Sequence, residues 1–290
     1  MNEIGKLYVI ATPIGNYEDI TFRAARILKE VDFVLAEDTR VTRTLLTSLG
    51  IEKRLISMNS YSEERKSEDV IGNLMSGQSG AFVSDAGTPC ISDPGYIMVK
   101  TAIDAGIDVI AVPGANACIA GLCVSGLPTA SFSFFGFLPR KAGDIKEVLE
   151  NVYNDSAALA VFYESPLRIA NTLDFIKEKF PQSNVVICND LTKRYERIYR
   201  GTIDNVIAEL SSNANAKKGE YTIIIEKNSK KKDKEELSLE AYLINEIVKG
   251  ANKKEAILKT QERLKGIATK KEIYAAAIRL EILMNQINLV

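Results

Sequence analysis

The residues best suited to hold a ligand lie between Gly80 and Gly95, in the sequence GAFVSDAGTPCISDPG. A short apolar run predicts a buried strand, and two groups of turn-forming residues, 85–89 and 92–95, follow it. Asp, Gly and Pro constrain the backbone in different ways, so their density predicts a loop of fixed shape at the carboxyl end of a sheet. Open α/β sheets bind their ligands at that edge. One such turn is typical of any connection between a strand and a helix, but two of them favour a ligand site.

The chain contains no histidine. This excludes a Ser-His-Asp triad, a Cys-His pair, a His-ligated zinc and a histidine general base. The four cysteines form no CxxC pair, and buried free thiols are favoured over a redox or metal site. Any chemistry must therefore need little proton transfer, or must use Lys, Asp, Glu or Tyr.

Two common nucleotide-binding loops are missing from the sequence. No GxxxxGK[ST] motif is present, and TPIGN at Thr12–Asn16 follows the first predicted strand in place of GxGxxG. A cofactor would therefore not be held mainly through a pyrophosphate at a helix N-terminus. Pro-Gly and Asp-Gly turns expose backbone N–H and C=O groups in fixed directions. Such turns suit a ligand with an amino-acid moiety, a ribose and an adenine edge.

The elements that position these loops fall into two sets. Apolar runs predict strands at 6–11, 33–36, 55–58, 81–83 and 108–112, with helices between them. This alternation predicts a mostly parallel sheet with helices on both faces. A second set of strands is predicted at 131–137, 157–163, 184–189, 198–201 and 221–226. Fewer helices separate these strands, which favours a mixed sheet with an antiparallel part, and Phe137–Arg140 is interpreted as a hinge between the halves.

Length and charge divide the chain further. With 290 residues, 46% of them apolar, the chain can bury more than one core. The residues from Lys230 onward include 13 Lys and Arg against 9 Asp and Glu, whereas the whole chain has a net charge of −1. The polar and basic run from Asn228 to Lys234 is interpreted as a linker. We therefore expect an N-terminal α/β domain at 1–130, a second α/β domain at 131–228, and a basic linker with a helical domain at 229–290.

No apolar run reaches the roughly 20 residues that span a bilayer. The N-terminal residues also lack the basic and apolar regions of a signal peptide. We expect a cytoplasmic protein with no membrane partner.

Six motifs in order resemble one known family, the ribosomal RNA small subunit methyltransferase I branch of the tetrapyrrole methylase superfamily. They are TPIGN at 12–16, EDTR at 37–40, SDAGTP at 84–89 with DPG at 93–95, VPG at 112–114, FYES at 162–165 and LTK at 191–193. The resemblance extends to about Lys227, and the segment from Gly250 to Tyr274 is similar to the small helix-turn-helix module that ends these enzymes.

The resemblance implies two α/β domains with S-adenosylmethionine (SAM) in the cleft between them, usually in a homodimer without a metal. The implied reaction transfers the SAM methyl group to the ribose 2'-hydroxyl of a cytidine in the decoding region of 16S (small-subunit) rRNA, with the rRNA or the 30S particle as partner. The family's cofactor residues correspond here to Pro13, Ser84, Asp85, Ala86, Gly87, Thr88, Asp93, Pro94, Gly95, Pro113, Gly114, Ala115, Asn116, Ala117, Phe162, Tyr163, Glu164, Gly219, Glu220, Tyr221 and Thr222.

The chemistry of such a reaction suits a chain without histidine. Displacement at a sulfonium has a neutral leaving group, so positioning supplies most of the rate. A 2'-hydroxyl is a weak nucleophile, however, and partial removal of its proton would help. The catalytic candidates are Asp38, Glu164, Glu196 and Lys193, the last as a base of lowered pKa or as an electrostatic partner. We expect Lys193 and Asp38 to lie nearest the reacting atoms.

Each candidate also has a simpler interpretation. Asp38 could form an ion pair with Arg40 in the loop. Glu164 could cap the helix that begins at Pro166. Lys193 and Arg194 could be solvated charges. Replacing Lys193 and Asp38 in turn with Ala and measuring methyl transfer at saturating SAM would test whether each acts on the reacting atoms.

The C-terminal pattern predicts three amphipathic helices with short connections. Lys253, Lys254, Lys270 and Lys271 lie near the starts of the second and third helices and could contact RNA phosphates. Three other functions remain open. They are methylation of a tetrapyrrole or cobalamin precursor, a diphthine-type protein methylation, and a ribosome- or nucleic-acid-binding factor without catalytic activity.

Overall fold

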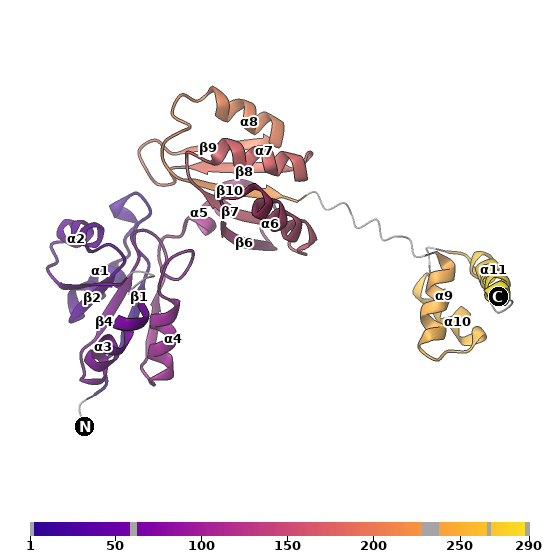
Figure 1. Cartoon of the computed structure of the whole chain (residues 1–290), viewed down its shortest axis with the longest axis horizontal. Helices are drawn as coiled ribbons and strands as arrows, with labels where there is room; N and C mark the ends of the chain where they lie inside the picture. Colours follow the sequence, from indigo (N-terminus) through magenta and orange to yellow (C-terminus); the bar gives the residue numbers. More distant parts are fainter. Residues whose placement is uncertain (1–2, 59–62, 228–237, 266–267, 288–290) are drawn as a thin grey trace. The chain divides into compact units, whose positions relative to one another are not determined.

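A computed structural model of the chain describes residues 3–58, 63–227, 238–265 and 268–287. The chain divides into two compact units, Met1–Asn228 and Ser229–Val290 (Figure 1). The predicted linker at 228–234 lies outside the described residues. None of the helices in the described ranges is both long and apolar enough to cross a membrane.

The first sheet has the order β3-β2-β4-β1-β5, and all of its strand pairs are parallel. Its strands are β1 (Leu7–Ile10), β2 (Phe33–Ala36), β3 (Arg54–Ser57), β4 (Gly80–Val83) and β5 (Val109–Val112). The helices that connect them are α1 (Phe22–Glu30), α2 (Thr39–Ser48), α3 (Glu63–Met75) and α4 (Tyr96–Asp104), with a short 3-10 turn, η1 (Tyr17–Asp19), before α1. The predicted parallel sheet is confirmed.

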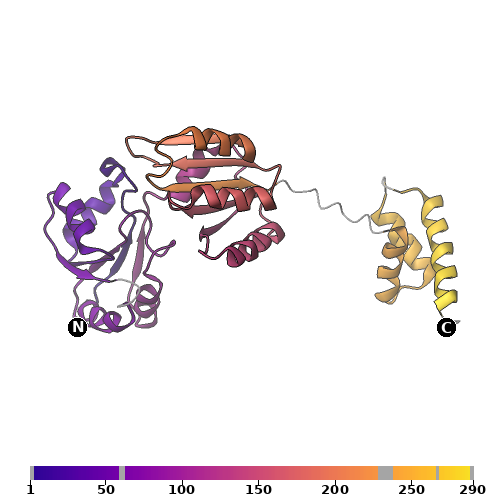
Figure 2. The ribbon, with the colours of Figure 1, turned by 45° about the horizontal axis from the view of Figure 1, so that its top comes forward.

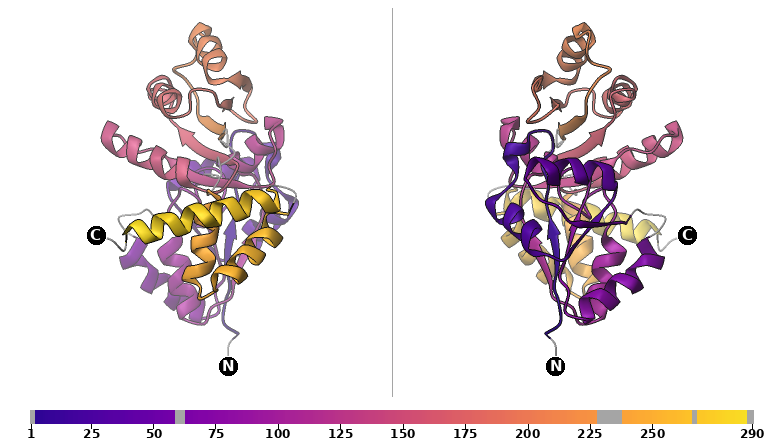
Figure 3. Two further views of the ribbon diagram at one scale, coloured as in Figure 1. Left: turned by 90° about the vertical axis from the view of Figure 1, so that its right-hand side faces the viewer. Right: turned by 90° about the vertical axis from the view of Figure 1, so that its left-hand side faces the viewer.

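Side chains of the first sheet alternate between two hydrophobic clusters. Val34 and Ala36 of β2 pack with α1 and α2 on one face. Phe33 and Leu35 of the same strand pack with α3 and α4 on the other face. Both faces are therefore covered by helices, which explains why these strands are continuous apolar runs (Figure 3).

The second sheet has the order β6-β7-β10-β8-β9. Its strands are β6 (Phe132–Phe137), β7 (Leu159–Glu164), β8 (Asn184–Asn189), β9 (Arg197–Thr202) and β10 (Tyr221–Glu226). Only β6 and β7 pair in parallel, and the other pairs are antiparallel. The helices α6 (Ala142–Asn154), α7 (Ile169–Lys179) and α8 (Ile203–Ser212) pack on one face, and α5 (Ala117–Ser125) packs on the other (Figure 2). The predicted mixed sheet is confirmed.

The chain passes from the first sheet to the second between β5 and α5. Cys118 and Leu122 of α5 pack against Val161 of β7 and Ile224 of β10, so α5 belongs to the layers of the second sheet although it precedes residue 131. The hinge predicted at 137–140 is wrong, because Phe137 is the last residue of β6, which is already paired with β7.

The C-terminal unit is a cluster of three helices, α9 (Leu239–Val248), α10 (Lys253–Arg263) and α11 (Lys270–Ile287) (Figure 3, left). Leu243, Ile257 and Ile273 are central to its hydrophobic core. Asn252 begins α10 with a capping box, in which the Asn252 side chain accepts from the Glu255 N–H and the Glu255 carboxylate accepts from the Asn252 N–H. The three predicted helices are confirmed.

Candidate functional site

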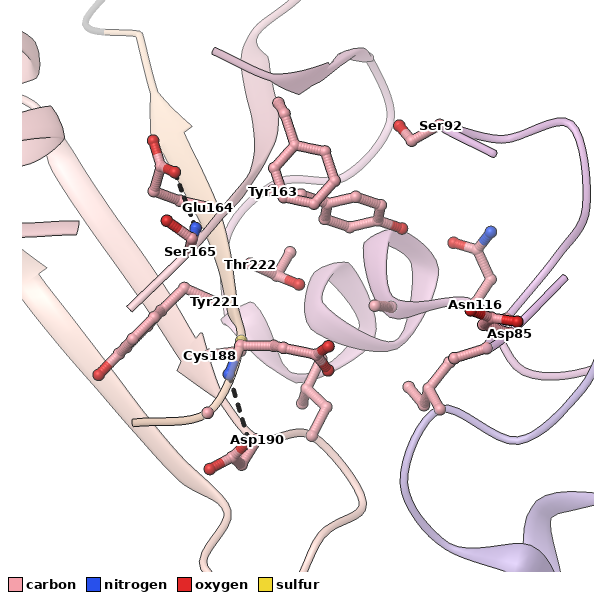
Figure 4. A pocket seen from close by; sticks show the side chains of 18 of the residues that line it. Asp85, Ser92, Asn116, Tyr163, Glu164, Ser165, Cys188, Asp190, Tyr221 and Thr222 are labelled. Carbon is pink, nitrogen blue, oxygen red and sulfur yellow. Dashed lines mark hydrogen bonds between the residues drawn. The ribbon is translucent and has the colours of Figure 1, made fainter. Parts of the chain in front are cut away.

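A cavity of about 550 Å³ lies where the loops at the carboxyl ends of β1, β4 and β5 face the second sheet. Figure 4 shows Asp85, Ser92 and Asn116 across from Tyr163 and Thr222. The lining residues are Ile14, Glu37, Asp85, Ala86, Gly87, Thr88, Ile91, Ser92, Asp93, Asn116, Ala117, Phe137, Tyr163, Glu164, Ser165, Pro166, Cys188, Asp190, Leu191, Lys193, Gly219, Glu220, Tyr221 and Thr222. Its volume falls in the range of cofactor and small-ligand sites, roughly 300–1,000 Å³.

Hydrogen bonds join the loops of the first sheet into one rim. Thr12 and Gly87 exchange two backbone bonds, of 2.8 and 3.0 Å. The Asp38 N–H donates to the Asp85 carboxylate over 2.9 Å, and the Thr88 hydroxyl donates to the Ala115 carbonyl over 3.1 Å. The rim is therefore set before any ligand binds, as the turn-rich sequence predicts.

Two loops of the cavity contain strained backbone. Cys90 and Ser92 follow β4 with φ of 69° and 66°, and Asp190 and Thr192 follow β8 with φ of 55° and 65°. Among the described residues, these four are the non-glycine positions with positive φ. Conformations of this kind cost about 1–3 kcal/mol each and cluster at binding sites.

The rim on the first sheet is acidic. The pKa values of Glu37, Asp85 and Asp93 are all raised, first by burial and then by repulsion from neighbouring carboxylates. Glu37 is repelled by both Asp85 and Asp93. This side of the cavity is therefore complementary to a cation.

Lys193 is the one cation among the described residues that line the cavity. Its Nζ donates to the Glu220 carboxylate over 2.8 Å and lies 3.2 Å from the Asp190 carboxylate. Burial lowers the Lys193 pKa, but the two ion pairs outweigh it and the net shift is upward. The interpretation of Lys193 as a base of lowered pKa is therefore wrong, because both carboxylates stabilise its charged form.

Gly219 allows this ion-pair cluster to form. It has a φ of 82°, and a Cβ at this position would lie 2.2 Å from an Asp190 carboxylate oxygen. Only glycine combines this backbone conformation with the close approach of the carboxylate.

Tyr163 forms an aromatic wall of the cavity. Its ring contacts Phe134 and Phe137 edge-on, at centroid distances of 4.9 and 5.7 Å. Its hydroxyl accepts from the Cys118 N–H over 3.1 Å, and burial raises its pKa to about 12. Tyr163 therefore stays protonated and can bind a ligand through its ring.

The cavity brings together many residues predicted to hold the cofactor. These are Asp85, Ala86, Gly87, Thr88, Asp93, Asn116, Ala117, Tyr163, Glu164, Gly219, Glu220, Tyr221 and Thr222. Tyr221 takes part although its side chain lies in the core, where its hydroxyl donates to the Ala216 carbonyl over 2.8 Å.

Other predicted cofactor residues support the cavity without lining it. They are Pro13, Ser84, Pro94, Gly95, Pro113, Gly114, Ala115 and Phe162. Phe162 points into the opposite core. Gly95 begins α4 with a φ of 130°, where a Cβ would lie 2.2 Å from the Phe82 ring.

Asp38 and Glu196 are not among the residues that line the cavity. Asp38 begins α2, where its carboxylate accepts from the Arg40 N–H over 2.8 Å and forms an ion pair with the guanidinium over 2.5 Å. Hydrogen bonds from the Arg40 side chain and backbone lower the Asp38 pKa to about 2. The Glu196 carboxylate accepts from the Thr192 N–H over 2.5 Å.

Glu164 lines the cavity but is only 1% exposed. Its two carboxylate oxygens accept from the Ser165 N–H over 2.7 Å and from the Thr172 hydroxyl over 2.6 Å. Arg168 completes an ion pair over 3.2 Å. Glu164 is not the cap of a helix beginning at Pro166, because α7 begins at Ile169 and its N-cap residue, Arg168, has no side-chain cap hydrogen bond. Its contacts with Thr172 and Arg168 instead join the end of β7 to α7.

The cofactor assignment from sequence missed several lining residues. They are Ile14, Glu37, Ile91, Ser92, Phe137, Ser165, Pro166, Cys188, Asp190 and Leu191. Most lie inside or next to a recognised motif, so extending each motif by one or two residues would have found them. Phe137 had no such signal, because it enters through the irregular pairing at the end of β6.

Comparisons with known proteins define the class. A family model described as Tetrapyrrole (Corrin/Porphyrin) Methylases matches residues 6–207. The structure of the methyltransferase CobJ aligns with a TM-score of 0.58 at 14% identity, covering 78% of this chain and 95% of that chain. The uroporphyrin-III-C-methyltransferase from Thermus thermophilus aligns with a TM-score of 0.52 at 19% identity, covering 77% and 94%. The two sheets have the fold of a tetrapyrrole methylase.

Curated relatives narrow the class. Ribosomal RNA small subunit methyltransferase I of Halalkalibacterium halodurans is 45% identical over 258 residues, which are 87% of this chain and 88% of that protein. The protein of the same name from Bacillus subtilis is 39% identical over 281 residues, covering 95% and 94%. The chain therefore belongs to the tetrapyrrole methylase family, in the group named ribosomal RNA small subunit methyltransferase I.

Proposed function

We propose that this methyltransferase transfers a methyl group from SAM to the ribose 2'-hydroxyl of a cytidine in the decoding region of small-subunit rRNA. The observation that carries the proposal is the 45% identity to a ribosomal RNA small subunit methyltransferase I over 88% of that protein's length. We further propose that the protein acts in the cytoplasm as a homodimer, with small-subunit rRNA or the 30S particle as its partner.

The residues of the cavity fit SAM in charge and in chemistry. Glu37, Asp85 and Asp93 supply negative charge for a sulfonium and an ammonium group. The rim also carries the backbone groups of its turns, which suit ribose and adenine edges. Apolar contact comes from Ile14 and Leu191. An acidic rim, fixed backbone polar groups and apolar contacts together suit the charge and the shape of SAM.

Bound SAM supplies a methyl group on a positively charged sulfur, which departs as a neutral thioether. The chain must then orient the attacking hydroxyl and stabilise the negative charge that develops on its oxygen. Lys193 provides that charge, and Asp190 and Glu220 fix its ammonium group through ion pairs of 3.2 and 2.8 Å. Asp38 is committed to Arg40 and α2, so we assign the electrostatic role to Lys193 alone.

The C-terminal helices supply a second contact with the RNA in this proposal. Lys254, Lys270 and Lys271 are exposed at the starts of α10 and α11. Lys253 is engaged by Glu281 in an ion pair of 2.5 Å, so it contributes less. Phosphate contacts by the exposed lysines would add affinity without sequence readout.

The test of the function combines two measurements on the full chain. Calorimetry should detect SAM binding, and incubation with tritiated SAM and unmodified small subunits should place the label on one ribose of the rRNA. Label on a tetrapyrrole precursor or on a protein, but not on rRNA, would contradict the proposal. SAM binding without any transfer would favour a non-catalytic factor.

SAM affinity should fall on acidification, beginning above the pH at which ordinary carboxyl groups titrate. The pKa values of Glu37, Asp85 and Asp93 are raised, so these groups gain protons early as the pH falls and the negative charge of the rim is lost. Calorimetry across the acidic range should show this loss. The affinity for S-adenosylhomocysteine, which has a neutral sulfur, should depend less on pH. The affinity of the Asp93→Asn variant for SAM should also depend less on pH than that of the wild type. An equal pH dependence of both ligands would contradict the electrostatic role of the rim.

A further inference from the structure

A groove of about 520 Å³ adjoins the cavity that we propose for SAM, which is called the donor cavity below. Its lining comes from the loop after β1 and the loop after β8, through Gly15, Asn16, Tyr17, Thr192, Lys193 and Arg194. Lys193 lines both spaces, and a Cβ on Gly15 would lie 2.4 Å from the Lys193 Cγ. The stem of Lys193 therefore forms the boundary between the groove and the cavity.

The sign of the charge changes across Lys193. The donor cavity is lined by six carboxylates, those of Glu37, Asp85, Asp93, Glu164, Asp190 and Glu220, and by one lysine. The groove is lined by Lys193 and Arg194, with no carboxylate among the described residues that line it. The neighbouring Glu196 directs its carboxylate at the Thr192 N–H. Anions therefore favour the groove and cations favour the cavity.

The two cations of the groove differ, because Lys193 is held by Asp190 and Glu220 whereas Arg194 can offer its charge to a ligand. Arg194 is exposed and has no carboxylate partner within the described ranges, and its guanidinium lies 5.5 Å from the Tyr195 ring. Among the residues that the structure describes, the buried Thr192 hydroxyl has no hydrogen-bond partner, and Thr192 has the left-handed backbone conformation. Buried hydroxyls without a partner are uncommon and require an explanation.

Two exposed aromatic rings accompany these charges. Tyr17 lines the groove with 49% of its surface exposed, and Tyr195, next to Arg194, is 71% exposed. Exposed aromatic rings beside unpaired cations are typical of proteins that stack the bases of single-stranded nucleic acid and hold its backbone.

We propose that this groove binds single-stranded RNA on one side of the methylated nucleotide, with Arg194 on a phosphate and Tyr17 stacked on a base. The inference rests on the proposed function, because a nucleotide whose ribose reaches the donor must continue past Lys193. The acidic cavity repels phosphate, so the strand leaves through the basic groove. A duplex could not present its bases to Tyr17, which limits the substrate to an unpaired segment.

The test uses the full chain and a short fluorescein-labelled single-stranded RNA, with anisotropy recorded at several salt concentrations. Arg194→Gln should reduce the slope of log affinity against log salt by about 0.7, the value for one phosphate contact on a single strand. Tyr17→Ala should weaken binding roughly 5- to 100-fold, as loss of one stacked base does, and Tyr17→Phe should restore it. Arg54→Gln is the matched control, because Arg54 is exposed at the amino end of β3, at the opposite edge of the sheet.

In methyl transfer to small subunits, Tyr17→Ala and Arg194→Gln should raise KM for the subunit while kcat and SAM binding change little. If both variants had the RNA affinity, salt slope and KM of the wild type, the inference would be overturned. The proposed function would be unaffected. If the variants lost RNA binding but the wild type transferred no methyl group to rRNA, RNA binding by the groove would be supported. The proposed function as an rRNA methyltransferase would be overturned. If Arg54→Gln and Arg194→Gln changed RNA affinity and its salt dependence equally, the effect would be general charge attraction. That result would overturn the inference.

Discussion

Lys193→Met should lower the rate of methyl transfer roughly 100- to 1,000-fold at saturating SAM, the usual effect of removing one preorganised electrostatic contact. Lys193 is the one cation among the described lining residues of the donor cavity, and Asp190 and Glu220 hold its ammonium group. Methionine keeps the length and the contact with Gly15 but removes the charge. Single-turnover transfer of labelled methyl to unmodified small subunits measures the effect.

Two further variants make this result specific. Lys193→Arg keeps a positive charge and should retain more activity than Lys193→Met. Lys29→Met removes an exposed lysine from the last turn of α1, which is not among the residues that line the cavity, and should leave the rate unchanged. Full turnover by Lys193→Met would eliminate Lys193 as the group that stabilises the reacting oxygen. The role would then pass to another residue of the cavity.

Glu164→Ala should destabilise the first unit by about 3–5 kcal/mol, because it removes one partner of a buried ion pair. Its carboxylate is 1% exposed and engages the Ser165 N–H, the Thr172 hydroxyl and Arg168. Arg168 in turn donates to the carbonyls of Leu138 and Pro139. The carboxylate thus ties the end of β7 to α7 and to the chain that leaves β6. Urea unfolding followed by circular dichroism measures the loss.

Glu178→Ala provides the comparison for Glu164. Glu178 forms an exposed ion pair with Lys146, so its loss should cost less than about 1 kcal/mol. If Glu164→Ala unfolds at the wild-type urea concentration but no longer transfers methyl groups, the structural role is contradicted. Proton acceptance by Glu164 would then account for its position in the cavity lining.

The strands could be predicted closely because their apolar runs leave few alternatives. Helix α6 has no counterpart among the sequence predictions, although Ile145, Leu149 and Val152 repeat at helical spacing. The sequence gives no clear signal for the start of α6, because the N-cap residue is Lys141, which makes no side-chain cap hydrogen bond. Helix α2 shows the opposite case. It begins at Thr39 with a clear signal, because the Asp38 side chain caps it by accepting from the Arg40 N–H.

The candidate site was predictable as a set of loops but less so residue by residue. Glu37 and Asp38 are adjacent carboxylates at the end of one strand, yet Glu37 lines the cavity and Asp38 caps a helix. Composition alone cannot separate them, because both roles suit an acidic residue after a strand. The pairing of Lys193 with Glu220 joins residues far apart in the sequence, and only the antiparallel register of β8 and β10 brings their loops together.

The buried thiol of Cys188 adds a chemical consequence for the donor cavity. Cys188 lines this cavity, and burial raises its pKa to about 12. Thiolates, not thiols, are the strong nucleophiles among sulfur groups. If the cavity holds the methyl donor as proposed, a protonated Cys188 would resist alkylation by it. The enzyme can keep a soft, space-filling sulfur in its cavity without inactivating itself through self-methylation.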